Sequence, residues 1–188
     1  MNNILKIAKV ISTTNSSMMW LISNEISNVT IFNDIMMFAC TRRNKHDKYI
    51  IKTSLAFICE NKKELEMLAR AGVSDIIATD VINPDIQVSP ALALACERFS
   101  VWVDIKFNTC EKLYNLKVPK VFRGVSFVFD DNNVWDIIAN KIMFNLETRL
   151  FVYGVSAPDV RRKLFNWVDY LGGSANVNGV SYHGCDKI

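Results

Sequence analysis

The chain has 188 residues, of which 50% are hydrophobic and 22% are charged, with a formal net charge of +3. This length fits one domain with a single core, and the composition is that of a globular protein, which excludes intrinsic disorder. The small positive charge falls short of the basic excess typical of a dedicated nucleic-acid-binding protein, so we expect a single α/β domain over residues 1–188.

From residue 49 onward, strand-like and helix-like patterns alternate along the chain. The predicted strands cover residues 49–58, 73–79, 100–106, 121–129, 149–153 and 168–171. The predicted helices cover residues 60–71, 90–98, 109–116, 133–145 and 157–166. Gly72 is a typical stop for the first helix, while Ser89 and Pro90 are a typical cap and first residue for the second. Residues 20–39 fit either a strand or a helix.

Strands that alternate with helices of about ten residues are typical of parallel βαβ units. Six predicted strands, with one or two more before residue 49, come close to the strand count of a closed barrel. A complete (β/α)₈ barrel, however, usually needs about 200 residues or more. The sequence therefore favours a small or incomplete (β/α)₈-like barrel of parallel strands. The alternative is an open parallel sheet with helices on both faces.

Charged residues at the ends of predicted strands are the candidate catalytic groups. Asp80 follows the strand over 73–79, and Asp104 and Lys106 lie near the end of the strand over 100–106. Sites in barrels and in open parallel sheets form at the carboxyl ends of strands, where such groups transfer protons. Because side chains alternate along a strand, Asp104 and Lys106 share a face and would have to pair if buried. The structural alternative is an internal ion pair or an exposed edge strand.

Two turns of small residues follow the last two predicted strands. Gly154 and Ser156 form the first turn, and Gly172, Gly173 and Ser174 form the second. If both strands are parallel, the two turns lie at the same edge of the sheet. Glycine lets a backbone approach a ligand closely, and free N–H groups there hold an anion. The structural alternative is a pair of tight strand-to-helix connections.

The segment that contains these turns, LFVYGVSAPDVRRKLFNWVDYLGGSANVNG (residues 150–179), resembles the last two strands of the phosphate-binding (β/α)₈ barrels. This superfamily includes phosphoribosylanthranilate isomerase, and its members grip a phosphate with a glycine turn after the seventh strand and a Gly-Ser turn after the eighth. The resemblance thus implies phosphate-binding roles for the residues of both turns. The segment is similar, more faintly, to the closing strands of tRNA-guanine transglycosylases. The isomerases' first-strand cysteine motif and the transglycosylases' Asp-Ser-Gly-Gly-Phe segment are absent.

The cysteines and the N-terminal segment indicate a reducing compartment. Five cysteines stand at wide, irregular spacings with no CxxC pair, which argues against disulfides and against a metal site. The N-terminal segment lacks the long apolar core of a signal peptide, and no window matches a membrane helix. We expect a soluble cytoplasmic protein with no metal, no cofactor and no membrane partner.

The leading functional hypothesis is binding of a phosphorylated small molecule or nucleotide at the carboxyl ends of the strands. Whether the chain is an enzyme stays open; if it is one, lyase or isomerase chemistry is expected. The first alternative is a non-catalytic interaction or assembly module on an enzyme-like fold, with a protein partner or a second copy of the chain. The second alternative is a nucleic-acid modification factor.

Two further segments bear on these alternatives. The basic run over residues 42–48 would fit contact with nucleic acid, although a solvated connecting loop is the favoured interpretation. His183 and Cys185 near the end of the chain fit a frayed tail better than a catalytic pair, because no third group is present to orient the histidine.

Overall fold

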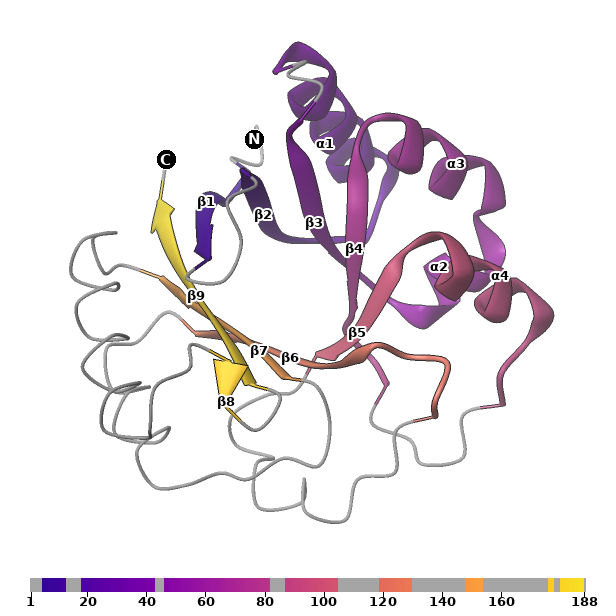
Figure 1. Cartoon of the computed structure of the whole chain (residues 1–188). Coiled ribbons are helices and arrows are strands. Elements are labelled where there is room, and N and C mark those ends of the chain that lie inside the picture. The colour runs from indigo at the N-terminus through magenta and orange to yellow at the C-terminus, as the bar shows by residue number, and fades with distance from the viewer. Residues whose placement is uncertain are drawn as a thin grey trace.

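The computed structural model describes residues 5–12, 18–42, 46–81, 87–104, 119–129, 148–153, 176–177 and 180–187. Its strands are β1 (Ile7–Ser12), β2 (Met19–Ile26), β3 (Lys48–Thr53), β4 (Val73–Ala78), β5 (Ser100–Asp104), β6 (Gly124–Phe129), β7 (Thr148–Tyr153), β8 (Asn176–Val177) and β9 (Val180–Lys187). Its helices are α1 (Val29–Thr41), α2 (Leu55–Glu60), α3 (Lys62–Arg70) and α4 (Pro90–Arg98). The α/β class expected from the sequence is confirmed (Figure 1).

The strands form one mostly parallel sheet in the order β1-β2-β3-β4-β5-β6-β7-β9-β8. Each strand from β2 to β6 is parallel to the next strand in the sheet, and β7 is parallel to β9. β8 is antiparallel to β9, and β1 is antiparallel to β2. β1 also pairs antiparallel with β9, from Ala8 opposite Lys187 to Ser12 opposite His183. β1 is therefore hydrogen-bonded both to β2, which follows it in the sequence, and to β9, near the other end of the chain.

The local signals for several elements were read correctly from the sequence. The predicted helix over 90–98 coincides with α4, and the backbone N–H of Leu92 donates to the Ser89 side chain at 3.1 Å. The predicted strands over 73–79 and 149–153 match β4 and β7 within one residue. The predicted helices over 109–116, 133–145 and 157–166, and the predicted strand over 168–171, lie outside the described residues.

The predicted strand over 49–58 was wrong in its second half. β3 ends at Thr53, and α2 begins directly afterwards. Ser54 caps this helix, because its side chain accepts a hydrogen bond from the Phe57 backbone N–H at 3.1 Å. The apolar run after Ser54 is thus one face of a short helix and not a continuation of the strand.

The frayed tail expected around His183 was also wrong. Residues 180–187 form β9, which is paired over most of its length with β7 on one side and β1 on the other. His183 lies opposite Phe151 of β7 and opposite Ser12 of β1. β9 is therefore the strand that follows β7 in the sheet, a position that the sequence analysis gave to residues 168–171.

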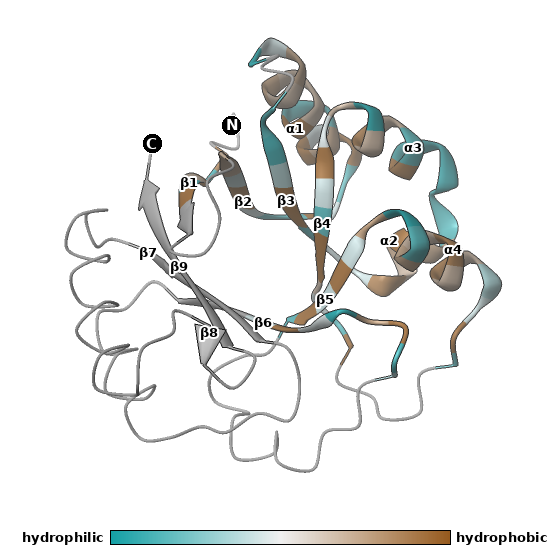
Figure 2. Cartoon of the chain, in the orientation of Figure 1, coloured by the Kyte–Doolittle hydropathy of each residue, from teal (hydrophilic) through white to brown (hydrophobic). Residues whose placement is uncertain are grey.

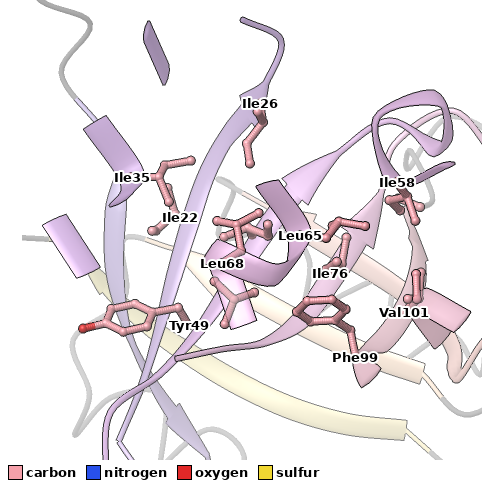
Figure 3. Close-up of a cluster of buried hydrophobic side chains, with 14 of the residues drawn as sticks. Ile22, Ile26, Ile35, Tyr49, Ile58, Leu65, Leu68, Ile76, Phe99 and Val101 are labelled. Atoms are coloured by element: carbon pink, nitrogen blue, oxygen red, sulfur yellow. The ribbon is translucent and has the colours of Figure 1, made fainter. Parts of the chain in front are cut away.

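All four described helices pack against one face of the sheet. Ile35 of α1, Ile58 of α2, Leu68 of α3 and Leu92 of α4 are at most 1% exposed and belong to one cluster of buried side chains. Figure 3 shows Ile35, Ile58 and Leu68 within this cluster. Figure 2 shows the hydrophobic stretches of β4 and β5 beneath α2 and α4. The opposite face carries a smaller buried cluster: Ala8, Val10, Met19, Leu21, Ile50, Ile77 and Trp102. In the part of the chain that the structure describes, no helix is long and apolar enough to cross a membrane.

Gly72, between α3 and β4, has a φ of +102°, in the left-handed region that favours glycine. A Cβ added there would lie 3.2 Å from the Asp47 carbonyl oxygen and 3.3 Å from the Tyr49 ring. We expect Gly72→Ala to lower the free energy of unfolding by about 1–2 kcal/mol, measured by urea denaturation. The exposed control Lys63→Ala on α3 should stay within about 0.5 kcal/mol of wild type. Equal stability of the two variants would contradict this interpretation.

Candidate functional site

Polar side chains from five consecutive strands or strand ends gather on the sheet face opposite the helices. In β5, Asp104 lies two residues beyond Trp102, and in β3, Lys52 lies two residues beyond Ile50. Because residues two apart share a face of a strand, these charged side chains lie on the same face as the smaller buried cluster. The full set, which we call the polar cluster, consists of Glu25, Lys52, Thr79, Asp104 and Ser126.

An ion pair joins the two charged residues at the centre of the polar cluster. Lys52 Nζ lies 2.9 Å from Asp104 Oδ2, and the two side chains are only 18% and 8% exposed. β4 lies between β3 and β5, so the lysine reaches over one whole strand to its partner. An ammonium and a carboxylate at this distance form a charge-assisted hydrogen bond. The pair therefore links the carboxyl ends of β3 and β5 across β4.

A second hydrogen bond extends the polar cluster to β2. Thr79 Oγ1 donates to Glu25 Oε1 at 2.7 Å, and the Thr79 backbone N–H donates to the Thr53 carbonyl at 3.0 Å. The pairing of β2 with β3 shifts register between Ile22 and Glu25. Such an irregularity re-aims the side chains that follow it. Glu25 consequently stands opposite Lys52 in the sheet, and the polar cluster carries two carboxylates and one ammonium.

Ser126 adds a buried hydroxyl group to the polar cluster, beside Asp104. It stands opposite Asp104 in the pairing of β5 with β6, and it is 0% exposed. Among the residues that the structure describes, no hydrogen-bond partner exists for Ser126 Oγ. A buried hydroxyl without a partner costs about 1–3 kcal/mol, so a group that can hydrogen-bond to it gains stabilisation there.

The residues below the polar cluster form an apolar floor. Ile50, Ile77 and Trp102 are each at most 1% exposed. The Trp102 ring is fixed because its Nε1 donates to Asp75 Oδ1 at 3.0 Å, while Ser74 Oγ donates to Asp75 Oδ2 at 2.7 Å. A few polar groups above a rigid apolar surface are typical of small-molecule sites.

The three predicted catalytic residues differ in where they lie relative to the polar cluster. Asp104 belongs to the polar cluster, whereas Asp80 is exposed and its Oδ1 accepts the Leu55 backbone N–H at 2.7 Å, which supports the start of α2. Lys106 lies outside the described residues. The predicted phosphate-binding residues also lie outside them: Gly154, Ser156, Gly172, Gly173 and Ser174.

Sequence reasoning missed the partner of Asp104. The alternation in β3 was a usable signal, because it places Lys52 on the face of Ile50 and at the carboxyl end of a buried strand. No comparable signal existed for Glu25, whose place depends on the register shift between β2 and β3. Ser126 could likewise be recognised as a member of the polar cluster only after its position opposite Asp104 was known.

Arg42, the first residue of the basic run over 42–48, packs against aromatic rings. Its guanidinium lies 4.4 Å from the centroid of a Trp20 ring and 5.0 Å from that of Phe38. Trp20 Nε1 in turn donates to Asp47 Oδ2 at 3.2 Å. Arg42 therefore covers Trp20 through a cation–π contact. Residues 43–45 of the run lie outside the described residues.

Cys40, Cys59 and Cys96 are free thiols. Burial raises the pKa of the Cys96 thiol to about 11, with a smaller contribution from Cys59, whereas Cys40 is exposed. Because the thiolate is the reactive form, we expect iodoacetamide at pH 8 to modify Cys40 well before Cys96, as measured by peptide mass spectrometry. The raised pKa also means that the unfolded chain loses this proton first, so stability should fall as the pH rises from about 9 towards 11. Equal modification rates would contradict the burial of Cys96.

In the described ranges, no group of three or more histidine, cysteine, aspartate or glutamate side chains is placed to hold a metal ion. No protein-family model, no curated protein and no solved structure matches the chain. The function proposed for this chain therefore rests on its own side chains, above all on those of the polar cluster.

Proposed function

We propose that the chain binds a small phosphorylated molecule at the carboxyl edge of its parallel strands, with the polar cluster contacting the part of the ligand that carries no phosphate. The observation that supports this most strongly is the ion pair between Lys52 and Asp104. A largely buried ion pair loses so much hydration that apolar residues of similar size would stabilise the fold as well or better. Its position at the carboxyl ends of parallel strands, where ligands bind in α/β proteins, favours a functional reason for it.

The charges of the polar cluster suggest how a ligand would be held. Glu25 and Asp104 against Lys52 leave one net negative formal charge, which disfavours a phosphate directly on the cluster. Ligand hydroxyl groups suit it better, since they donate to the carboxylates and accept from Lys52 and Ser126. The phosphate itself belongs, in this proposal, to the turn at Gly154 and Ser156, which follows the carboxyl end of β7 in the sequence. A sugar phosphate or a nucleotide combines both kinds of group.

The same pair could serve lyase or isomerase chemistry. Asp104 would take a proton from the ligand, and the Lys52 ammonium, 2.9 Å away, would stabilise negative charge developing on the neighbouring ligand oxygen. Lys106 remains a predicted second proton-transfer group near the end of the same strand.

We further propose that the sheet closes into a small barrel made of β1 to β7 and β9. The pairing of β1 with β9 and the location of all four described helices on one face support closure. Such a barrel would differ from a (β/α)₈ barrel in its antiparallel first strand. The polar cluster would then lie in the mouth of the barrel, above its apolar interior.

A thermal-shift titration with inorganic phosphate, ribose 5-phosphate and a nucleoside monophosphate tests the proposed function. A ligand that binds the folded state stabilises it by RT ln(1 + [L]/Kd), about 2.7 kcal/mol at a hundredfold excess over Kd. We expect saturable stabilisation by ribose 5-phosphate or the nucleotide, and its loss in Gly154→Asp. If none of the three shifts the melting temperature of a folded sample, the proposal fails and a protein interaction module becomes the better explanation.

A further inference from the structure

A polar cleft with a volume of about 840 Å³ opens at the amino-terminal edge of the strands, opposite the edge that carries the polar cluster. Its walls are the end of α4, the first residues of β4 and β5, and residues 120–123 before β6. Among the described residues that line it, Arg98, Lys120 and Arg123 are basic and Glu97 is acidic.

The charge of this cleft differs in sign from that of the polar cluster. The described residues of its lining carry two net positive formal charges, whereas the whole chain carries +3. Arg98 and Lys120 are both exposed, from the end of α4 and from the segment before β6. The described lining of the cleft and the polar cluster therefore carry formal charge of opposite sign, so the cleft attracts anions.

The walls of the cleft are fixed by backbone and aromatic contacts. The Arg123 backbone N–H donates to the Val101 carbonyl at 2.8 Å, and that of Phe122 donates to the Pro119 carbonyl at 3.1 Å. Phe99 and Phe122 are buried at 3% and 6% exposure. The segment that carries Lys120 is thus held against β5, so the two basic side chains flank a preformed opening.

Backbone groups do not favour an anion in this cleft. The carboxyl end of a helix carries partial negative charge, and α4 ends there at Arg98. An anion would consequently depend on the basic side chains alone. Lysine and arginine hold phosphate oxygens by charge-assisted hydrogen bonds, and a volume of this size accommodates a small ligand or a few linked phosphates.

We propose that this cleft binds a phosphate-bearing anion through Arg98 and Lys120, at a site separate from the polar cluster. The phosphates of a free nucleotide and those of a nucleic-acid backbone share this chemistry. Binding should weaken steeply with added salt, because the attraction comes from exposed charges.

Binding of inorganic pyrophosphate by calorimetry, and of a fluorescein-labelled oligo(dT) 15-mer by anisotropy, tests this site at low salt. We expect Arg98→Glu and Lys120→Glu each to weaken binding at least tenfold. The matched control Lys63→Glu has the same change in net charge on an exposed position of α3 and should bind as wild type does. Unchanged melting temperatures would show that the variants are folded.

The outcomes separate this site from the one at the carboxyl edge. Pyrophosphate binding that is lost in Arg98→Glu and Lys120→Glu supports the proposal with a small anion as the ligand. Loss of oligonucleotide binding alone supports it with nucleic acid as the source of the phosphates. Binding that survives both variants but disappears in Gly154→Asp overturns this site and leaves the proposed function standing. No binding of either probe at low salt also overturns it.

Discussion

Trp102→Ala is expected to lower the free energy of unfolding by about 3–5 kcal/mol. Trp102 is 1% exposed, packs in the apolar floor beneath the polar cluster, and donates its Nε1–H to the buried Asp75 carboxylate. Alanine would leave a cavity and remove a hydrogen bond from a buried acceptor, and both changes destabilise the folded state. Urea denaturation followed by far-ultraviolet circular dichroism measures the difference.

Trp102→Phe is the matched variant, because it retains an aromatic ring and removes the N–H donor. Its stability should fall between those of wild type and Trp102→Ala. A loss below about 1 kcal/mol for Trp102→Ala would mean that the ring is not buried, and it would contradict the apolar floor.

Asp104→Ala is expected to destabilise the protein by about 2–4 kcal/mol, because it leaves the Lys52 ammonium largely buried without its carboxylate. The loss of stability is smaller than for a fully buried charge without a partner, because the Lys52 side chain is 18% exposed and contacts some water. The double variant Lys52→Met with Asp104→Leu removes both charges and should lie close to wild type in stability. Denaturation of Lys52→Met, Asp104→Leu and the double variant completes a double-mutant cycle.

The cycle separates the structural role of the pair from its functional role. If each single variant is as stable as wild type, the two side chains do not interact, and the geometry of the polar cluster is wrong. If the double variant is as unstable as the singles, the pair is needed for folding. In that case the argument that it is kept for ligand binding loses its main support.

The parts of the fold that could be predicted from the sequence are those with local causes. α4 was predicted with its cap and both ends, because Ser89 and Pro90 act within one helical turn. α2 was wrongly predicted as the second half of a strand, although its signal is equally local. Ser54 follows a strand-like run, and the apolar residues after it fit a strand as well as a helix.

The parts that could not be predicted depend on pairings between distant segments. β1 and β9 come from opposite ends of the chain, and nothing near His183 indicates that Ser12 lies opposite it. The polar cluster has the same origin, since Lys52 meets Asp104 only after β3, β4 and β5 are in register. Asp104 could be predicted as a site residue because it is the last residue of its own strand. Its partner Lys52 could be identified only from the tertiary structure.

Calorimetric titration of ribose 5-phosphate into wild type and into the double variant Lys52→Met with Asp104→Leu tests the central claim most directly. We expect saturable binding to wild type and at least tenfold weaker binding to the double variant, a loss of about 1.4 kcal/mol, at nearly equal stability. Equal affinity of the two proteins would contradict the claim that the polar cluster contacts the ligand.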